Sequence, residues 1–516
     1  LLAYWDQDPG NDVILLYIES VGDARRFARL ARETGRRKPV IAVKSGRSAA
    51  GARAAASHTG ALLAASDVTV DALFRQAGII RTDTLEEMFD VATILANQPP
   101  PKGDRVAIVT NAGGLGILCA DTLEANGMHV PPIAEDTKAA LRAFLPPEAS
   151  VGNPIDMIAS ATAEDYERTI RTVAEDPGVD AMIVIYIPPQ ATKAEEITRG
   201  IVRGIREVQG RIPVVTTYMS SAGLHADLRA DGVRIPTFAF PEQAAIAMAR
   251  ACAYGRWRER PAGTVPRFHD IRADEAAAII AGGLDRESGW LTALEVERLL
   301  ACYGLPVARS ERASTPEEAG AAAARIGTPV ALKAFGPDIV HKTDVGAVRL
   351  GLRGPSAVQA AAGEMVERVA AAGLALDGFV VQEMVSEGVE MLVGVAHDPL
   401  FGPVVACSAG GTAVELVRDV SVRVTPITDL DASEMVRSLK TFPLLDGFRG
   451  APKADVAALE EVILRVSALV EGHPEIVEMD CNPVMVLPHG AVVVDARVRV
   501  KEAPPLKPLA AQAGAR

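Results

Sequence analysis

Two nearby runs set the architecture of the first part of the chain: Pro39-Val40-Ile41-Ala42-Val43-Lys44-Ser45-Gly46-Arg47 and Ser57-His58-Thr59-Gly60-Ala61-Leu62-Leu63. The first begins as an apolar strand, and the second belongs to a loop of small residues that opens onto an alanine-rich helix. A strand that passes through a short loop into a helix is the repeating unit of parallel α/β sheets. These runs therefore predict an α/β domain.

Further strand and helix patterns extend this unit on both sides. A buried strand is expected over 12–18 and an amphipathic helix over 24–33, before the strand at 39–43. A helix over 68–76 and a short strand over 78–80 follow. This alternation predicts a parallel sheet with helices on both faces.

The rest of the chain divides at segments rich in proline, glycine or polar residues. A Pro-rich linker at 97–103 separates the first domain, residues 1–98, from a second domain of the same type at 102–256. We expect a linker at 257–287, a third domain at 288–502 and a disordered tail at 503–516. The third domain opens with a helix, for which Thr292 and Glu295 form a capping box. The first residues read as the middle of an element, so we expect the natural N-terminus to lie upstream.

Composition narrows the classes of function. The net charge of −13 and the sequence pI of about 5.3 argue against nucleic acid as a partner. The five cysteines are far apart and form no CxxC pair, which favours a reducing compartment and no zinc site. No apolar run reaches the roughly 20 residues of a membrane span. We expect a cytoplasmic protein without a membrane partner.

His58 is the first candidate for chemistry. A helix N-terminus stabilises negative charge, and a histidine beside it can hold a transferred phosphoryl group. Glu19, at the end of the 12–18 strand, lies on the same sheet edge and could fix the histidine tautomer. The alternatives are a histidine that only packs the turn and a solvated charge at a strand end.

The loop Asn111-Ala112-Gly113-Gly114-Leu115-Gly116 lies between a strand and a helix. Its glycines let the backbone approach an anion at the helix start, although the spacing fits neither a Walker A loop nor a dinucleotide fingerprint. The alternative is an ordinary tight turn. A second helix start, near Gly60, would allow a phosphohistidine to be stabilised from two sides.

The third domain carries features of a nucleotide site. Lys333 ends an apolar strand and precedes a glycine-bearing loop that contains His341. Two strands at 379–385 and 391–395 suit a nucleotide held between two lobes. Asn482 and Asp495 offer oxygen ligands on adjacent strands, as Mg²⁺ bound together with phosphates requires. Each feature alone could be an ordinary surface charge, but their order along the chain favours a site.

Taken together, these motifs resemble the NDP-forming acyl-CoA synthetases of the ADP-forming acetate–CoA ligase type, relatives of succinyl-CoA synthetase. The resemblance implies two flavodoxin-like, parallel-sheet domains followed by an ATP-grasp domain. It implies a phosphohistidine at His58 oriented by Glu19. Phosphate contacts are implied for four residues, namely Gly60, Asn111, Gly113 and Gly114. The run at 152–156 resembles a loop near that phosphate site.

The resemblance also assigns roles in the third domain. Lys333 matches a phosphate-binding lysine, and His341 resembles a second phosphate-carrying histidine. The nucleotide contacts implied beside Lys333 are Gln382, Glu383, Val385 and Glu390. Asn482 and Asp495 match the Mg²⁺ ligands.

The reaction implied is acyl-CoA + ADP + phosphate to carboxylic acid + CoA + ATP, through an acyl phosphate and a phosphohistidine. It would use ATP or ADP, Mg²⁺ and CoA, with a short-chain or aryl carboxylic acid as substrate. The resemblance implies a homo-oligomer and an N-terminal CoA-binding domain that these residues lack. Two alternatives stay open. One is a regulatory module of a protein lysine acetyltransferase that senses acyl-CoA or nucleotide, and the other is a different ATP-grasp carboxylate ligase.

Overall fold

The structure is a computed structural model. It describes residues 1–19, 24–45, 67–188, 194–219, 235–327, 329–336, 347–385, 387–398, 400–410 and 419–502. The chain forms two compact units, Leu1–Ala262 and Gly263–Arg516, which are described separately. The expected tail at 503–516 lies outside the described residues.

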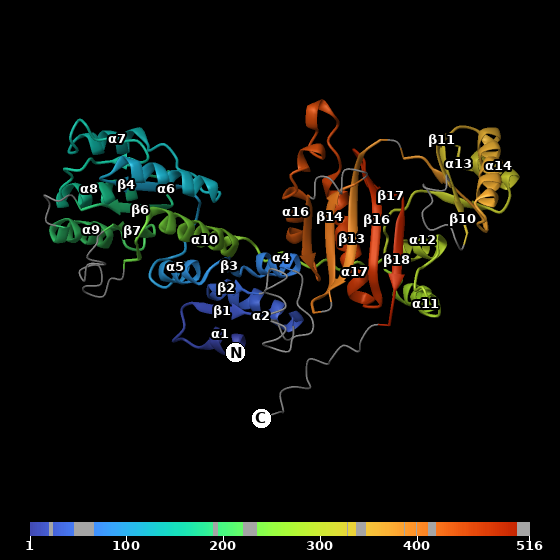
Figure 1. Ribbon diagram of the computed structural model, residues 1–516, viewed down its shortest axis with the longest axis horizontal. Coiled ribbons are helices and arrows are strands. Elements are labelled where there is room, and N and C mark those ends of the chain that lie inside the picture. The colour runs from blue at the N-terminus through green and yellow to red at the C-terminus, as the bar shows by residue number, and fades with distance from the viewer. Residues whose placement is uncertain are drawn as a thin grey trace, which may run out of the picture. The chain divides into compact units, whose positions relative to one another are not determined.

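The first unit begins with a small parallel sheet (Figure 1). Its strand order is β1-β2-β3, with β2 fully buried in the middle. The strands are β1 (Ile14–Ile18), β2 (Val40–Lys44) and β3 (Ile80–Thr82). The helices of this part are α1 (Leu2–Gln7), α2 (Ala24–Arg37), α4 (Asp67–Ala77) and α5 (Leu85–Leu95). The expected strand–helix alternation is therefore present.

The same unit contains a second parallel sheet, of order β5-β4-β6-β7-β8. Its strands are β4 (Val106–Thr110), β5 (Ile155–Asp156), β6 (Ala181–Tyr186), β7 (Val214–Tyr218) and β8 (Thr237–Phe238). Its helices are α6 (Gly113–Ala125), α7 (Glu135–Arg142), α8 (Ala163–Ala174), α9 (Ala194–Val208) and α10 (Pro241–Glu259). In chain order this is the 2-1-3-4-5 arrangement of flavodoxin-like folds. In such folds the strand order reverses next to the first strand, although all strands are parallel. The predicted flavodoxin-like class is confirmed.

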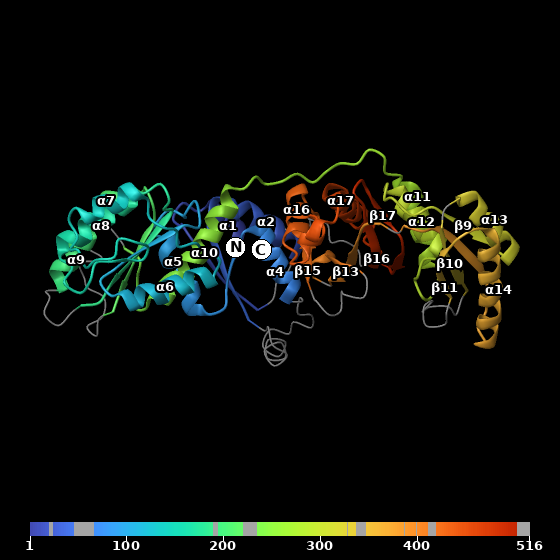
Figure 2. The same cartoon turned by 90° about the horizontal axis from the view of Figure 1, so that it is seen from above.

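The two sheets of the first unit share one hydrophobic core. Ile41 and Ile80 of the first sheet belong to the same buried cluster as Ile108 and Ile183 of the second. Helices α5 and α10 pack side by side within this cluster (Figures 1 and 2). The segment expected as a linker at 97–103 thus joins two sheets that bury apolar surface together.

Helix α10 continues past the start of the linker expected at 257–287. Trp257 stacks against Tyr254, with ring centroids 6.3 Å apart, within the range that aromatic pairs prefer. The Arg36 guanidinium lies 4.4 Å from the Trp257 ring centroid. These contacts hold the last turn of α10 against α2, so the connection to the second unit begins only after Glu259.

The second unit contains a four-stranded antiparallel sheet of order β11-β10-β12-β9. Its strands are β9 (Ser310–Ala313), β10 (Val330–Phe335), β11 (Val348–Leu352) and β12 (Gly378–Glu383). Helices α13 (Pro316–Ile326) and α14 (Pro355–Ala371) bury one face of it. Lys333 was expected to end its strand, but β10 continues to Phe335.

A larger antiparallel sheet has the order β15-β14-β13-β16-β17, with β18 also paired to β16. Its strands are β13 (Val389–Asp398), β14 (Gly402–Ala409), β15 (Val420–Val424), β16 (Ile476–Val486), β17 (Ala491–Val493) and β18 (Ala496–Val500). The helices around it are α11 (Ala273–Leu284), α12 (Ala293–Cys302), α16 (Asp429–Arg437) and α17 (Val456–Gly472), with 3₁₀ turns η3 (Phe442–Leu444) and η4 (Phe448–Gly450). The expected capping box of Thr292 and Glu295 begins α12.

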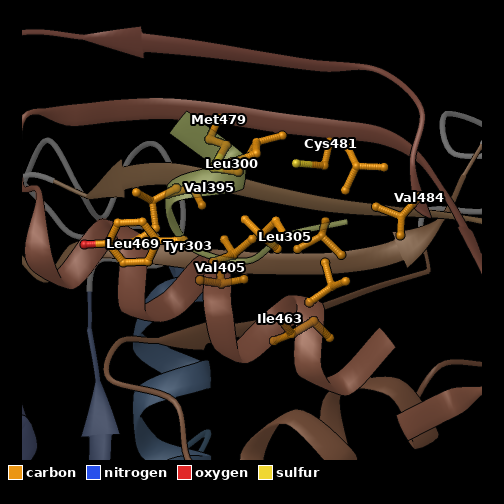
Figure 3. Packing of buried hydrophobic residues seen from close by; sticks show 14 of the residues in the cluster. Leu300, Tyr303, Leu305, Val395, Val405, Ile463, Leu469, Met479, Cys481 and Val484 are labelled. Atoms are coloured by element: carbon orange, nitrogen blue, oxygen red, sulfur yellow. The ribbon is translucent and has the colours of Figure 1, made fainter. Parts of the chain in front are cut away.

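The large sheet has one apolar face and one polar face. Figure 3 shows Val395 of β13 and Met479 of β16 packed with Leu300 and Ile463 in the core. Side chains alternate along a strand, so the residues between these core positions point the other way. Glu390, Asp480 and Asn482 occupy such positions. The polar face is therefore where a ligand of this unit would meet the sheet.

Candidate active site

A cavity of about 430 Å³ lies in the second unit, between the four-stranded sheet and the polar face of the large sheet. Each predicted nucleotide or metal residue among the described positions lines it. They are Lys333, Gln382, Glu383, Val385, Glu390, Asn482 and Asp495. Residues separated by about 160 positions in sequence are thus brought to one cleft by two sheets.

The Val494 carbonyl organises one wall of this cleft. It accepts a hydrogen bond from Lys333 Nζ at 3.3 Å and another from Gln382 Nε2 at 3.0 Å. Lys333 Nζ also lies 3.9 Å from Asp495 Oδ1. The lysine is therefore held over the cleft with its charge close to a carboxylate. Gln382 Oε1 is buried and meets no donor within the described part of the chain.

Asn482 and Asp495 fit a magnesium ion bound together with phosphates. The backbone N–H of Asn482 donates to the backbone carbonyl of Asp495 at 3.0 Å, which fixes these two stretches of backbone beside each other. Both side chains present oxygen to the cavity, and Mg²⁺ usually takes one or two protein oxygens beside phosphate and water. The described residues hold no cluster of three or more His, Cys, Asp or Glu side chains suited to a metal, so a closed, all-protein cage is not seen there.

Sequence reasoning missed two groups in the cleft. Asp480 lines the cavity and pairs with Arg497, with 3.2 Å between Oδ2 and Nη2. Period-two spacing from Asn482 along one strand could have found Asp480. The second group, the Val494 carbonyl, belongs to the backbone, so no residue type in the sequence indicates it.

The carboxyl edge of the first sheet carries Glu19 and Lys44. Glu19 directly follows β1, as expected, and Lys44 is the last residue of β2. Lys44 Nζ donates to the carbonyl of Glu19 at 3.1 Å and to that of Ser45 at 2.5 Å. The predicted residues His58, Gly60 and His341 lie outside the described residues.

Asn111 follows β4, where the strand order of the second sheet reverses, and its side chain is hydrogen-bonded to backbone. Its Nδ2 donates to the Ile187 carbonyl at 2.8 Å, and its Oδ1 accepts from the Ile187 amide at 3.0 Å. Asn111 therefore ties the end of β4 to the end of β6. Both ends of the side-chain amide are thus bonded to backbone, and the phosphate contact of Asn111 stays a prediction.

The start of α6 is an open helix N-terminus. Ala112 precedes the helix and offers no side-chain cap, so the first amides lack the usual acceptor. Among the described residues outside the helix itself, no atom lies within 4 Å of a Cβ built on Gly114, whereas a Cβ on Gly113 would meet Asp156 Oδ2 at 2.6 Å. Gly113 thus faces the loop at 152–156, while no described part of the chain beyond α6 crowds Gly114.

That loop is held to the sheet by Asn153. Its Oδ1 accepts from the Ile108 amide at 3.0 Å, and its Nδ2 donates to the carbonyls of Val106 and Pro131. These bonds keep Asp156 beside α6. The loop expected near the phosphate site therefore lies at the helix start.

The five cysteines are unpaired and buried. Burial raises the pKa of each thiol, to about 12 for Cys119 and Cys407. Such thiols are poor nucleophiles and poor metal ligands. Within the described residues, none of the helices combines the length and the apolar character needed to cross a bilayer.

Three domain models match the chain in succession. A succinyl-CoA ligase like flavodoxin domain matches residues 1–95, a ligase-CoA domain residues 106–263, and an ATP-grasp domain residues 283–500. The two sheets of the first unit and the cleft of the second fall within these three segments.

Relatives match over almost the whole chain. An ADP-forming acetate–CoA ligase of Archaeoglobus fulgidus is 36% identical over 97% of this chain and 72% of its own length. An ADP-forming 4-hydroxybutyrate–CoA ligase of Nitrosopumilus maritimus is 33% identical over 95% of this chain and 70% of its own. A solved acetyl-CoA synthetase chain of Candidatus Korarchaeum cryptofilum, complexed with coenzyme A and Ca-AMPCP, is 37% identical over 44% of this chain and 100% of its own, with a TM-score of 0.42. The chain belongs to the family of ADP-forming acyl-CoA ligases.

Proposed function

We propose that this chain catalyses the reversible conversion of acyl-CoA, ADP and phosphate to carboxylic acid, CoA and ATP. The observation that carries the proposal is the convergence of Lys333, Gln382, Glu390, Asn482 and Asp495 on one cleft. Family membership supports the reaction class.

The reaction would proceed in three displacements. A phosphate oxygen attacks the thioester carbonyl, and the C–S bond breaks to release CoA and leave an acyl phosphate. A nitrogen of the His58 imidazole then attacks phosphorus, and the carboxylic acid leaves with the bridging oxygen. An ADP β-phosphate oxygen finally attacks the phosphohistidine, and the P–N bond breaks to give ATP. His341 is a candidate carrier between the last two steps.

The described residues support these steps by position and charge. Glu19 would hold the His58 ring, and the open amides of α6 at Gly113 and Gly114 would stabilise phosphate. Lys333 would neutralise nucleotide phosphates, since it lines the cavity near Asp495. Glu383 at the end of β12 and Val385 just after it would bound the base, together with Glu390, which lines the same cavity. Asn482 and Asp495 would hold Mg²⁺, which would neutralise charge on the transferred phosphoryl group.

The proposal also covers the substrate, the assembly and the location of the protein. The substrate is a short-chain or aryl carboxylic acid, and the acetate and 4-hydroxybutyrate named for two relatives support the short-chain class. A homo-oligomer and a CoA-binding domain outside these residues are supported by the family resemblance. A cytoplasmic location is supported by the five unpaired thiols.

The test is ³²P transfer from [γ-³²P]ATP to the purified chain in the presence of Mg²⁺. We expect an acid-labile, alkali-stable label that His58→Ala removes. Loss in His341→Ala, with His58→Ala still labelled, would make the second histidine the first acceptor. Nucleotide binding without any label would overturn the relay and favour a regulatory module. Label that survives both substitutions would favour a different ATP-grasp ligase.

A further inference from the structure

Lys44 is a buried lysine that the proposed reaction does not use. The residue is 7% exposed and ends β2, directly opposite Ile18 in the parallel pair. Burying an ammonium group is costly unless hydrogen bonds compensate for the lost water. Lys44 therefore has to be explained by what its Nζ contacts.

Those contacts lie where two strands leave the sheet. Nζ donates to the carbonyl of Glu19, one residue beyond β1, and to that of Ser45, one residue beyond β2. The Ser45 amide in turn donates to the Ile18 carbonyl at 3.0 Å. One cation thus fixes the backbone at the exit of both strands, on the edge that carries Glu19.

The groups around Lys44 offset the effect of burial on its pKa only in part. Desolvation lowers the pKa of Lys44; Asp67 opposes this, Arg81 adds to the lowering and Glu19 opposes it. Asp67 also bonds Arg81, with 2.6 Å between Oδ1 and Nη2, so its charge is shared. A lysine kept here against a desolvation cost fits a need for a cation at this edge.

We propose that Lys44 is a positioning residue for phosphoryl transfer, which fixes the Glu19 backbone so that the Glu19 carboxylate is aimed correctly. The inference rests on the proposed function, in which Glu19 orients His58. Loss of Lys44 would slow transfer without changing nucleotide affinity, because the Nζ contacts seen among the described residues are backbone carbonyls at the edge of the first sheet. Misplacement by about 1 Å can reduce a rate on the order of 10²-fold.

Lys38 provides a matched control within the same sheet. Its Nζ also donates to two backbone carbonyls, those of Trp5 at 2.8 Å and Asp8 at 2.6 Å. Lys38 precedes β2, at the opposite edge from Glu19. Lys38→Met therefore removes the same kind of bond where no phosphoryl chemistry is proposed.

The experiment measures the rate of ³²P labelling and the KM for ATP in the full chain, together with its melting temperature. We expect Lys44→Met to slow labelling on the order of 10²-fold at unchanged KM. Lys44→Arg, which keeps the charge, should recover part of the rate. Lys38→Met should lower the melting temperature and leave labelling within about twofold of the original chain.

A double-mutant cycle with Glu19→Gln decides whether Lys44 acts through Glu19. We expect the double variant to label no more slowly than Glu19→Gln alone. Additive losses, or equal losses in Lys38→Met and Lys44→Met, would overturn the positioning role. If the original chain shows no His58-dependent label, the proposed function itself fails, and this outcome is distinct from a normal rate in Lys44→Met.

Discussion

The two regions proposed to bind phosphate are built in different ways. The cleft of the second unit presents ionic side chains, chiefly Lys333 from β10 and Asp495 from the connection between β17 and β18. The sheet edges of the first unit present backbone amides at the start of α6, and their polar side chains bond the backbone instead. In the proposed mechanism, the cleft side chains would contact the ligand directly. At the edges, the side chains would shape the backbone that contacts the ligand.

The difference teaches where a substitution should act. Removing a cleft side chain removes a contact with nucleotide, so binding and turnover should fall while the fold is retained. Removing an edge side chain releases a strand end, so the geometry of the phosphate site and the stability of the fold should change together. Four substitutions test this contrast.

The strongest test in the cleft is Lys333→Met. It removes the cation near Asp495 and keeps most of the side-chain volume, so stability should change little. Loss of one preorganised electrostatic group typically reduces a rate by about 10²- to 10³-fold. We expect a loss of that size in ³²P labelling from ATP. Lys453→Met, at a lysine whose side chain is 75% exposed, is the control and should label normally.

The corresponding test at the edge is Asn111→Asp. It replaces the donor to the Ile187 carbonyl with an oxygen and adds negative charge beside the start of α6. We expect the KM for phosphate to rise and acyl-CoA cleavage to slow on the order of 10²-fold. The melting temperature should fall, because the partly buried Ile187 carbonyl loses its donor.

The control for this prediction is Asn126→Asp. Asn126 is exposed at the other end of α6, where it bonds the Thr122 carbonyl. It should keep the phosphate KM within about twofold of the original. An equal effect of both substitutions would mean that Asn111 acts only through general charge or stability.

A smaller test separates ligand contact from packing within α6. A Cβ on Gly114 meets no atom within 4 Å in the described part of the chain outside α6, and alanine is the better helix former by up to about 1 kcal/mol. Gly114→Ala should therefore leave stability unchanged or raised, yet crowd a phosphate at the helix start. We expect about a tenfold higher KM for phosphate, equivalent to about 1.4 kcal/mol.

The contrasting variant is Gly116→Ala. Its Cβ would lie 3.1 Å from Pro154 Cβ and 3.2 Å from Thr110 Cγ2, so stability should fall. A stable Gly114→Ala protein with an unchanged phosphate KM would argue against a phosphate site at this helix.

The same difference explains what the sequence could predict. Lys333, Asn482 and Asp495 were found because their side-chain chemistry is itself the signal, and the structure brings them to one cavity. Asn111 was found as part of a glycine-rich loop, but its contact with Ile187, 76 residues later and just beyond β6, was not expected. That contact depends on strand order, which a local motif does not contain.

The fold could be predicted further than the site. Apolar runs identified the strands β1, β2 and β3 within about two residues of their ends. The common core of the two parallel sheets was not expected, because it depends on α5 and α10 packing across a Pro-rich segment that reads as a boundary. Packing between distant helices leaves little trace in local composition.

The smallest effect is expected for Arg497→Gln, which tests the role of charge in the cleft of the second unit. Arg497 pairs with Asp480 across 3.2 Å in the cleft, and its side chain is 59% exposed. Exposed pairs of this kind contribute about 0.2–1 kcal/mol, so Arg497→Gln should barely change the melting temperature. It leaves the Asp480 charge uncompensated in a cavity that receives phosphates. ATP binding, measured by calorimetry, should therefore weaken about two- to fivefold, and the difference from the original chain should shrink as salt is raised. If the weakening of ATP binding persists unchanged in high salt, Arg497 contacts the nucleotide directly. The cleft would then bind nucleotide less through long-range charge than proposed, and its contrast with the amides at the start of α6 would be smaller.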